Sequence, residues 1–197
     1  MTYLIGFTGV SGSGKTTLVN TLANELNKRG YKTIVVQEVA RRVFNVFKGK
    51  YNVKSLNDIR CNDTMFVEFQ RETLINQLYD EQNAIRMKPH IVLTDRTIYD
   101  CMVYTMYFGK INVLLTILQS IPLKVIEPTY RLIFLVEPFT SDYTALDDGV
   151  RTPDLEHLDD LQVLFNTIVP YDYKVKPASV EERVKYVIEV LRYEGVL

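Results

Sequence analysis

The sequence contains few of the residues that cross-link small folds or form metal centres. Its 197 residues include two cysteines, Cys61 and Cys101, two histidines and no tryptophan. Two isolated cysteines cannot build a disulfide framework or a thiolate metal cluster. His90 opens a predicted strand and His157 stands among acidic and apolar residues, so we expect neither to form a metal cluster. We therefore expect reduced thiols, structural histidines and a fold that is held together by an apolar core.

The chain also lacks an excess of charge and a long apolar run. Its 23 Lys and Arg residues nearly balance 24 Asp and Glu residues, which leaves no general positive field for nucleic acid or an anionic membrane. No apolar stretch has membrane-spanning length, and the N-terminal residues lack the basic segment and cleavage site of a secretory signal. These absences predict a cytoplasmic protein without a membrane partner.

Apolar residues make up 47% of the chain and charged residues 24%, which is ordinary for a globular protein. The length is sufficient for one full hydrophobic core, and no linker, repeat or low-complexity segment divides the chain. We expect a single domain over residues 1–197.

Short apolar segments alternate with longer segments of helical periodicity. The strands expected are 3–8, 32–37, 90–94, 131–136 and 171–175. The helices expected run from 15 to a stop at Gly30, over 62–87, 98–108, 111–121 and 155–169, and onward from a Ser179 cap, with Gly109 ending the helix 98–108. This alternation predicts an α/β fold with three layers and a mostly parallel five-stranded sheet. The polar residues 138–154 predict a lid loop.

The most specific signal is the segment Gly9-Val10-Ser11-Gly12-Ser13-Gly14-Lys15-Thr16, which matches the phosphate-binding pattern G-x-x-x-x-G-K-[ST] between a strand and a helix. Its glycines allow successive amide N–H groups to point inward, and the following helix N-terminus attracts anions. Lys15 can neutralise the terminal phosphates of ATP, and the Thr16 hydroxyl can bind Mg²⁺. An incidental glycine-rich turn is the alternative. The nucleotide-binding residues expected are Gly9, Ser11, Gly12, Ser13, Gly14, Lys15, Thr16 and Thr17.

Two carboxylates stand at the predicted ends of strands, where ligands of parallel sheets bind. Asp95 follows a strand of the buried type, and we expect its carboxylate to interact with the magnesium ion. Its alternative role is to cap the next helix. Glu38 follows the second strand and can take a proton from an acceptor hydroxyl, while its alternative is a salt bridge to Arg41 or Arg42.

Two arginines are candidates for contact with the transferred phosphate. Arg96 adjoins Asp95 and can hold the acceptor or the phosphate through two hydrogen bonds, or else form a structural ion pair. Arg151 stands in the acidic loop Asp147-Asp148-Gly149-Val150-Arg151, in the manner of an arginine finger supplied by the same chain. A surface ion pair is its alternative.

Taken together, the loop 9–16, Glu38 with Arg41 and Arg42, Asp95-Arg96-Thr97 and Asp148-Gly149-Val150-Arg151 resemble the nucleoside and nucleotide kinase branch of the P-loop proteins. Within that branch the chain is similar to bacterial and phage AAA-like small kinases related to the kinase domain of nicotinamide riboside kinase and adenylyltransferase enzymes. Deoxynucleoside kinases share an Asp-Arg-Ser-like element and the glutamate after the second strand. The resemblance spans nearly the whole chain.

The resemblance implies a sheet of strand order 2-3-1-4-5, an acidic Walker B position at Asp95 and an acceptor site near Glu38 and Arg96. It also implies a lid around Arg151, adenine contacts near Pro177 and Ala178, and ATP in preference to GTP.

Our leading hypothesis is an ATP- and Mg²⁺-dependent kinase that acts on a nucleoside- or nucleotide-like small molecule. The catalytic residues expected are Lys15, Glu38, Asp95, Arg96 and Arg151, with Thr16 and Asp95 on the metal and Glu38, Arg41, Arg42 and Arg96 on the acceptor. A kinase for a nucleic-acid 5′ hydroxyl or a modified base is the second hypothesis, which Lys48, Lys50 and Lys54 keep open. The third is an ATP-dependent switch that binds a protein partner. A second copy of the chain also remains open as a partner.

Overall fold

The computed structural model describes residues 1–120, 130–139 and 157–197 and contains the expected alternation of strands and helices. The strands are β1 (Tyr3–Thr8), β2 (Thr33–Val36), β3 (Ile91–Asp95), β4 (Tyr130–Val136) and β5 (Tyr173–Val175). The helices are α1 (Lys15–Lys28), α2 (Val39–Tyr51), α3 (Leu56–Arg60), α4 (Asp63–Arg86), α5 (Ile98–Gln119), α6 (Leu158–Ile168) and α7 (Val180–Tyr193). All five predicted strands are confirmed. Most of the predicted lid loop 138–154 lies outside the described residues.

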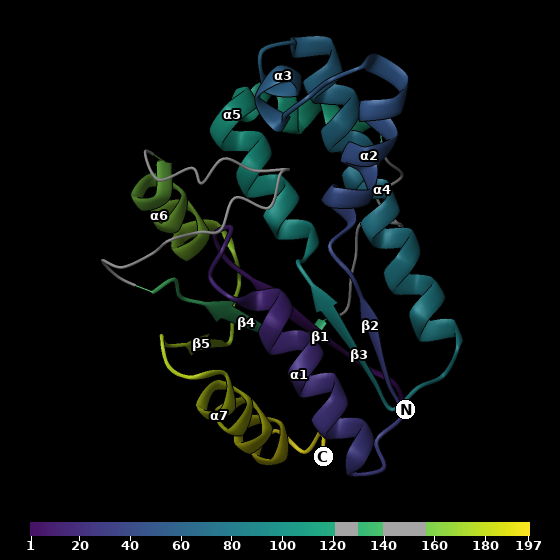
Figure 1. Cartoon of the computed structure of the whole chain (residues 1–197), viewed down its shortest axis with the longest axis vertical. Helices are drawn as coiled ribbons and strands as arrows, with labels where there is room; N and C mark the ends of the chain where they lie inside the picture. The colour runs from purple at the N-terminus through teal and green to yellow at the C-terminus, as the bar shows by residue number, and fades with distance from the viewer. Residues whose placement is uncertain (121–129, 140–156) are drawn as a thin grey trace.

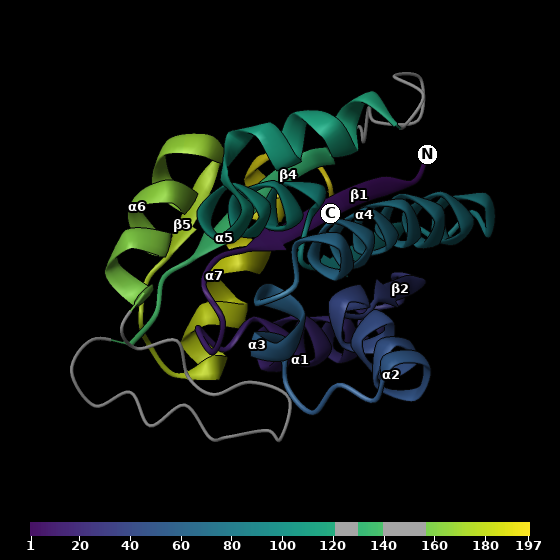
Figure 2. The same cartoon turned by 90° about the horizontal axis from the view of Figure 1, so that it is seen from above.

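The five strands form one parallel sheet in the order β2-β3-β1-β4-β5, as the resemblance implied. Helices α1 and α7 cover one face of the sheet, and α4, α5 and α6 cover the other (Figure 2). In the register of the sheet, Phe7 on β1 lies opposite Asp95 on β3 and Phe134 on β4. The carboxyl ends of these three strands therefore meet at one edge of the sheet.

The central strands read as continuous apolar runs because both of their faces are covered. All five residues of β3 are buried, and so are five of the six residues of β1. On the side of α1 and α7, the rings of Phe7 and Phe134 stack with centroids 5.2 Å apart within the largest apolar cluster. This core fixes the strand ends that carry the charged residues of the site.

A group of helices lies beyond the carboxyl ends of β2 and β3, at the top of the molecule in Figure 1. It consists of α2, α3 and the parts of α4 and α5 that pack against them. Helices α2 and α3 were not predicted from the sequence, where residues 39–61 carried no expected element. An apolar stripe on α2, formed by Val39, Val43, Phe44 and Phe47, binds α2 to α4.

The prediction that Gly109 ends a helix is wrong, because α5 continues through it from Ile98 to Gln119. The reason is packing between α4 and α5. A Cβ atom at Gly109 would lie 2.4 Å from Cε1 of Phe66 on α4. Glycine is present there because it lets two helices approach closely, and it does not act as a stop signal.

We expect Gly109→Ala to lower the free energy of unfolding by about 1–3 kcal/mol, because the new methyl group overlaps a buried ring. The matched control is Gly49→Ala on α2, where a Cβ meets no atom within 4 Å. That change should raise stability by about 0.5–1 kcal/mol, as alanine does in an exposed helix. Denaturant titration of both variants measures the difference, and equal values would contradict the packing role of Gly109.

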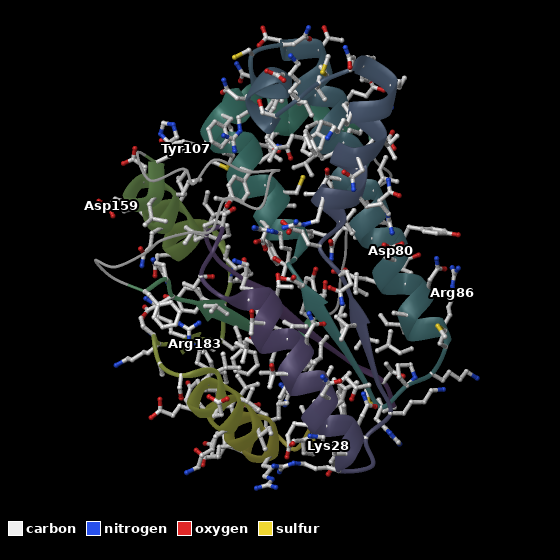
Figure 3. All side chains as sticks on the ribbon, viewed as in Figure 1. Lys28, Asp80, Arg86, Tyr107, Asp159 and Arg183 are labelled. Carbon is white, nitrogen blue, oxygen red and sulfur yellow. The ribbon has the colours of Figure 1, made fainter. Side chains whose placement is uncertain are left out.

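Both histidines form hydrogen bonds with neighbouring residues. His90 Nδ1 accepts a hydrogen bond from the Lys32 amide at 2.8 Å, and His157 contacts the hydroxyl of Tyr107 at 2.8 Å (Tyr107 is labelled in Figure 3). Within the described residues no group of three or more His, Cys, Asp or Glu side chains is arranged to hold a metal ion. No helix among them is long and apolar enough to cross a membrane.

Candidate active site

The phosphate-binding loop connects β1 to α1 and relies on three glycines with positive φ. These are Gly9 at 134°, Gly12 at 79° and Gly14 at 84°, and Gly14 is the N-cap of α1. A Cβ atom at Gly9 would lie 2.6 Å from the carbonyl oxygen of Val136 on β4, so space and backbone conformation both require glycine. The first amides of α1 have no partner within the helix and therefore suit an anion.

Lys15 is 4% exposed and holds its ammonium group over this loop. Its Nζ donates to the Val10 carbonyl at 2.6 Å and to Ser13 Oγ at 3.0 Å. A buried ammonium that donates to neutral loop oxygens suits an anion as an additional partner. The loop and Lys15 together therefore fit the β- and γ-phosphates of ATP.

Thr16 and Asp95 bring two oxygen ligands together. Thr16 Oγ1 donates to Asp95 Oδ2 at 2.5 Å, although the two residues belong to α1 and β3. Asp95 is 1% exposed, while Thr16 faces solvent. A hydroxyl beside a carboxylate at a phosphate-binding loop is a donor set that Mg²⁺ prefers. Asp95 does not cap α5, because Thr97 occupies the N-cap and its amide donates to Asp100 Oδ2 at 2.8 Å.

Arg96 joins the strand ends to the loop. Its Nε donates to Glu38 Oε1 at 2.7 Å, one Nη donates to Asp100 Oδ1 at 2.9 Å, and the other donates to Ser11 Oγ at 3.2 Å. The guanidinium is buried with both carboxylates. Burial opposes its charge, but Tyr104 and the carboxylates of Asp100 and Asp95 outweigh this effect and raise the pKa of Arg96 above its usual range.

The backbone of Arg96 is in an unusual conformation, with a φ of 96°. Positive φ is uncommon for a residue with a side chain and persists only where the surroundings enforce it. Here the amide of Arg96 donates to the Phe7 carbonyl at 3.0 Å, and the carbonyl of Arg96 accepts from Thr94 Oγ1 at 2.6 Å. This turn points the guanidinium back toward the phosphate-binding loop.

Two residues of this cluster, Asp100 and Tyr104, were not predicted from the sequence. Asp100 is 2% exposed and also accepts from Thr8 Oγ1 at 2.7 Å, so it links the ends of β1 and α5. Tyr104 accepts from the Ser11 amide at 3.1 Å, and its ring lies 5.4 Å from the guanidinium carbon of Arg96. Asp100 and Tyr104 are four residues apart on α5 and therefore lie on one face of this helix, which is a signal that the sequence does contain.

A cavity opens beside Arg96, between α2, α3, α4 and α5. Its polar end contains Ser11, Arg96 and Asp100, next to the phosphate-binding loop. Its remaining wall is mostly apolar and aromatic, with Gln70, Thr73, Gln77 and Arg60 as further polar members. The cavity is lined by Ser11, Val39, Ala40, Leu56, Ile59, Arg60, Phe66, Phe69, Gln70, Thr73, Gln77, Arg96, Thr97, Asp100, Cys101, Tyr104 and Phe108.

One wall residue of the cavity is the thiol Cys101, to which the sequence analysis gave no role in the site. Cys101 is buried, and its Sγ lies 3.3 Å from Oε1 of Gln70, to which it donates. Burial raises the pKa of the Cys101 thiol to about 12. The thiol therefore stays protonated at neutral pH and acts as a hydrogen-bond donor, not as a nucleophile.

The structure separates the two arginines that follow Glu38. Arg41 Nε lies 3.7 Å from Glu38 Oε2, at the rim of the cluster. Arg42 instead pairs with Asp80 on the outer side of α4 at 2.8 Å (Asp80 is labelled in Figure 3). Arg42 does not line the cavity described above. The position of Arg42 therefore does not support the expectation that it contacts the acceptor.

The residues expected to contact adenine lie on the far side of the loop. Ala178 lines a second pocket together with Lys174, Lys176 and Arg183, between β5 and α7, while Pro177 is not among its lining residues. Arg183 was also missed by the sequence analysis. Its Nη1 donates to the Ser13 carbonyl at 2.7 Å, and its Nε donates to the Lys176 carbonyl at 3.1 Å (Arg183 is labelled in Figure 3). It therefore supports the phosphate-binding loop from beneath.

Arg151 lies outside the described residues, and its role as an arginine finger stays a prediction. Five other members of the predicted site, Lys15, Thr16, Glu38, Asp95 and Arg96, lie around one loop. Lys15, Thr16 and Asp95 lie at the predicted phosphate and metal positions. Arg96 lines the cavity and its Nε donates to Glu38, which is not itself among the lining residues.

Comparison with known proteins places this arrangement in a family. A family model described as an AAA domain matches residues 4–183. A search of curated proteins gives no match. Among solved structures, thymidylate kinase from Ehrlichia chaffeensis is similar, with a TM-score of 0.62, 20% identity and coverage of 96% of this chain and 98% of that chain.

Deoxyadenosine kinase from M. mycoides, solved with the products dCMP and a flexible dCDP bound, is also similar in structure. Its TM-score is 0.65, with 13% identity and coverage of 96% of this chain and 99% of that chain. At these identities the likeness establishes the fold, which is that of two P-loop kinases. Because the family model covers most of the chain, the protein belongs to this AAA domain family of P-loop proteins.

Proposed function

We propose that the protein is an ATP- and Mg²⁺-dependent kinase that transfers the γ-phosphate to a hydroxyl group of a nucleoside. The observation that carries this proposal is the cavity beside the phosphate-binding loop. Its polar end holds Arg96 and Asp100, and its wall is aromatic and apolar. A nucleoside has the matching parts, since its sugar hydroxyls are polar and its base is flat and largely apolar at its faces.

The charges at the polar end favour an acceptor that carries no phosphate. Arg96 already binds two carboxylates, those of Glu38 and Asp100. An acceptor phosphate placed there would meet these two negative groups as well as the phosphates of ATP. Of the other arginines nearby, Arg42 is paired with Asp80 on the outer side of α4, Arg41 lies beside Glu38 at the rim, and Arg60 lies over the ring of Phe108. A nucleoside therefore fits the site better than a nucleoside monophosphate.

The phosphate-binding loop would orient the donor. Lys15 would bind the β- and γ-phosphate oxygens, and the amides at the start of α1 would hold the chain of phosphates in place. Thr16 and Asp95 would hold Mg²⁺, which when bound neutralises charge on the phosphates. Arg183 would keep the loop in shape through its bond to the Ser13 carbonyl.

Glu38 and Arg96 would act on the acceptor. The hydroxyl oxygen attacks the γ-phosphorus, the bond from that phosphorus to the β–γ bridging oxygen breaks, and ADP leaves with the electron pair. The hydroxyl proton passes to the carboxylate of Glu38, which lies 2.7 Å from Arg96 Nε. The Arg96 guanidinium stabilises the negative charge that develops on the transferred group.

The proposal is tested by incubating the protein with γ-labelled ATP and Mg²⁺ together with nucleosides, nucleoside monophosphates, nicotinamide riboside, and DNA or RNA oligonucleotides. We expect label in a nucleoside monophosphate, with at least tenfold preference for nucleosides over their monophosphates. Label only in oligonucleotides, with a rate that falls steeply with salt, would replace the proposal with a nucleic-acid kinase. ATP binding without any labelled acceptor would favour a nucleotide-dependent switch.

Asp95→Asn tests the metal part of the site. We expect it to lower kcat by roughly 10²-fold or more and to raise the Mg²⁺ concentration needed for half-maximal rate, because the amide carries no charge for the metal. Nucleotide affinity should change little, and the amide oxygen can still accept from Thr16. The control is Asp80→Asn, which alters a carboxylate on the outer side of α4. An unchanged Mg²⁺ dependence in Asp95→Asn would reduce Asp95 to a structural partner of Thr16.

A further inference from the structure

A buried polar cluster lies behind Arg96, on the side away from the phosphate-binding loop. It contains Gln77 and Glu81 on α4, Thr94 on β3 and Tyr130 on β4. Gln77 is 3% exposed, Glu81 is 2% exposed and Thr94 is fully buried. Burying four polar side chains in an apolar core is costly unless they are bonded and have a purpose. Neither the phosphate-binding loop nor the proposed phosphoryl transfer uses them.

The hydrogen bonds of the cluster converge on the backbone of Arg96. The Gln77 amide nitrogen lies 2.7 Å from Glu81 Oε1, 2.7 Å from Thr94 Oγ1 and 3.1 Å from the Arg96 carbonyl oxygen. Thr94 Oγ1 donates to the same carbonyl at 2.6 Å. The amide nitrogen of Gln77 carries two hydrogens. When one of them bonds to Glu81, the other points toward Thr94 and the carbonyl of Arg96.

Glu81 is itself held in place from a third element. Tyr130 on β4 donates from its hydroxyl to Glu81 Oε1 at 2.7 Å, and the same hydroxyl accepts from the amide of Ile98 at 3.1 Å. Ile98 is the first residue of α5, two positions after Arg96. The cluster thus contacts the strained turn at Arg96 from both of its sides, through the Arg96 carbonyl and through the start of α5.

We propose that Glu81 is a positioning residue for Arg96, which it holds in the positive-φ conformation by orienting Gln77; this inference rests on the proposed function. A backbone with φ of 96° needs external support, and the hydrogen bonds from Gln77 and Thr94 supply it at the carbonyl. Without Glu81 the Gln77 amide is free to turn. The turn at Arg96 then relaxes, and its guanidinium leaves the polar end of the cavity.

The ionisation of Glu81 provides a readout that ordinary packing would not. Burial raises the pKa of Glu81 to about 7, although hydrogen bonds from Gln77, Tyr130 and Thr94 oppose the shift. Asp100 on α5 adds a further negative charge, and among the described residues the titratable hydroxyl of Tyr130 on β4 also faces Glu81. Among the described residues, Glu81 Oε2 has no hydrogen-bond partner. A neutral hydroxyl there costs less than an anionic oxygen, so the protonated form suits the cluster.

The sign of the pH effect follows from this shift. A pKa raised from 4.5 to about 7 means that the folded protein binds a proton that the unfolded chain has lost. The contribution of this proton to the free energy of unfolding is fully present below pH 4.5 and is lost as the pH rises through about 7. The same rise disturbs the support of Arg96, so we expect wild-type kcat to fall across pH 7.

Glu81→Gln keeps the size and the acceptor oxygen of the side chain but cannot ionise. We expect its kcat to match wild type within about twofold at pH 6 and to lack the fall across pH 7, while its Tm loses the corresponding pH dependence. Glu72→Gln on the exposed side of the same helix is the matched control and should follow wild type. If Glu81→Gln shows the wild-type kcat profile, the proposed role of Glu81 is wrong.

Glu81→Leu removes the acceptor altogether. We expect kcat to fall roughly 10- to 100-fold, with the KM for ATP unchanged within about twofold, because the phosphate-binding loop is untouched. A folded Glu81→Leu variant with lower Tm but wild-type kcat would make Glu81 purely structural. Should this variant not fold, the pH profile of Glu81→Gln decides alone.

A readout without turnover separates this inference from the proposed function. The ¹⁵Nε–¹H signal of Arg96, identified by its loss in Arg96→Lys, reports the bond to Glu38. We expect Glu81→Leu to shift or broaden this signal, while Glu72→Gln leaves it in place. Absence of any phosphorylated nucleoside overturns the proposed function only, whereas an unchanged Arg96 signal in Glu81→Leu overturns the positioning role.

Discussion

Lys15→Ala is expected to reduce phosphoryl transfer from ATP by about 10³-fold or more. The ammonium group is buried over the loop between the Val10 carbonyl and Ser13 Oγ, where its charge is poorly screened by water. Loss of one preorganised charge beside a transferring phosphoryl group has effects of this size or larger. ATP affinity should also fall, because Lys15 would bind the phosphates before the reaction as well as during it.

The control for this variant is Lys28→Ala, an exposed lysine in the last turn of the same helix (labelled in Figure 3). It should leave kcat and ATP affinity within about twofold of wild type. Circular dichroism should show both variants folded, with a modest loss of Tm in Lys15→Ala because two loop oxygens lose their donor. Retained turnover in a folded Lys15→Ala variant would remove the basis for assigning the loop to ATP.

Glu38→Gln should lower kcat by about 10² to 10⁴ with little change in ATP affinity, because the hydroxyl proton of the acceptor loses its recipient. The amide oxygen can still accept from Arg96 Nε, so the arrangement around Arg96 persists. The measurement is kcat and both KM values for the nucleoside and ATP over a range of pH.

A second carboxylate variant distinguishes proton transfer from charge balance at Arg96. Asp100→Asn also removes a negative partner of Arg96, but the Asp100 carboxylate is occupied by Thr8, Thr97 and Arg96. We expect its kcat to fall far less than that of Glu38→Gln. Equal losses in the two variants would mean that Glu38 acts through Arg96 and takes no proton.

The parts of the site that sequence reasoning predicted are those with local determinants. The loop 9–16 is defined by glycines and a lysine within eight consecutive residues, and its position between β1 and α1 follows from the neighbouring patterns. Asp95 follows an apolar run, and the parallel sheet then brings it opposite Phe7 and within reach of Thr16. Strand ends of this kind converge in every open parallel sheet.

The parts that were missed depend on contacts between distant segments. Gly109 has the residue type of a helix stop, and only Phe66 on α4 explains why a helix continues through it. Glu81 and Gln77 lie in a helix whose sequence contains many polar residues, and nothing local marks these two as buried. Arg183 acts on Ser13, which is 170 positions away in the chain.

One omission was avoidable. Val39, Val43, Phe44 and Phe47 recur at helical spacing, so the stripe that buries α2 was present in the sequence. The five-residue α3 was less accessible, because a single turn capped by Ser55 and Asp58 gives too short a pattern to distinguish from a loop. These two helices matter because they supply part of the cavity wall, including Val39, Leu56 and Ile59.

The most direct test of the account is a crystal structure of the protein with Mg²⁺, a non-hydrolysable ATP analogue and the nucleoside that it phosphorylates best. We predict the phosphates in the loop 9–16, the base in the cavity lined by Phe66, Phe69 and Tyr104, and a sugar hydroxyl within hydrogen-bond distance of the Glu38 carboxylate. A nucleoside bound elsewhere, for example in the pocket between β5 and α7, with no contact to Glu38 or Arg96, would contradict the central claim.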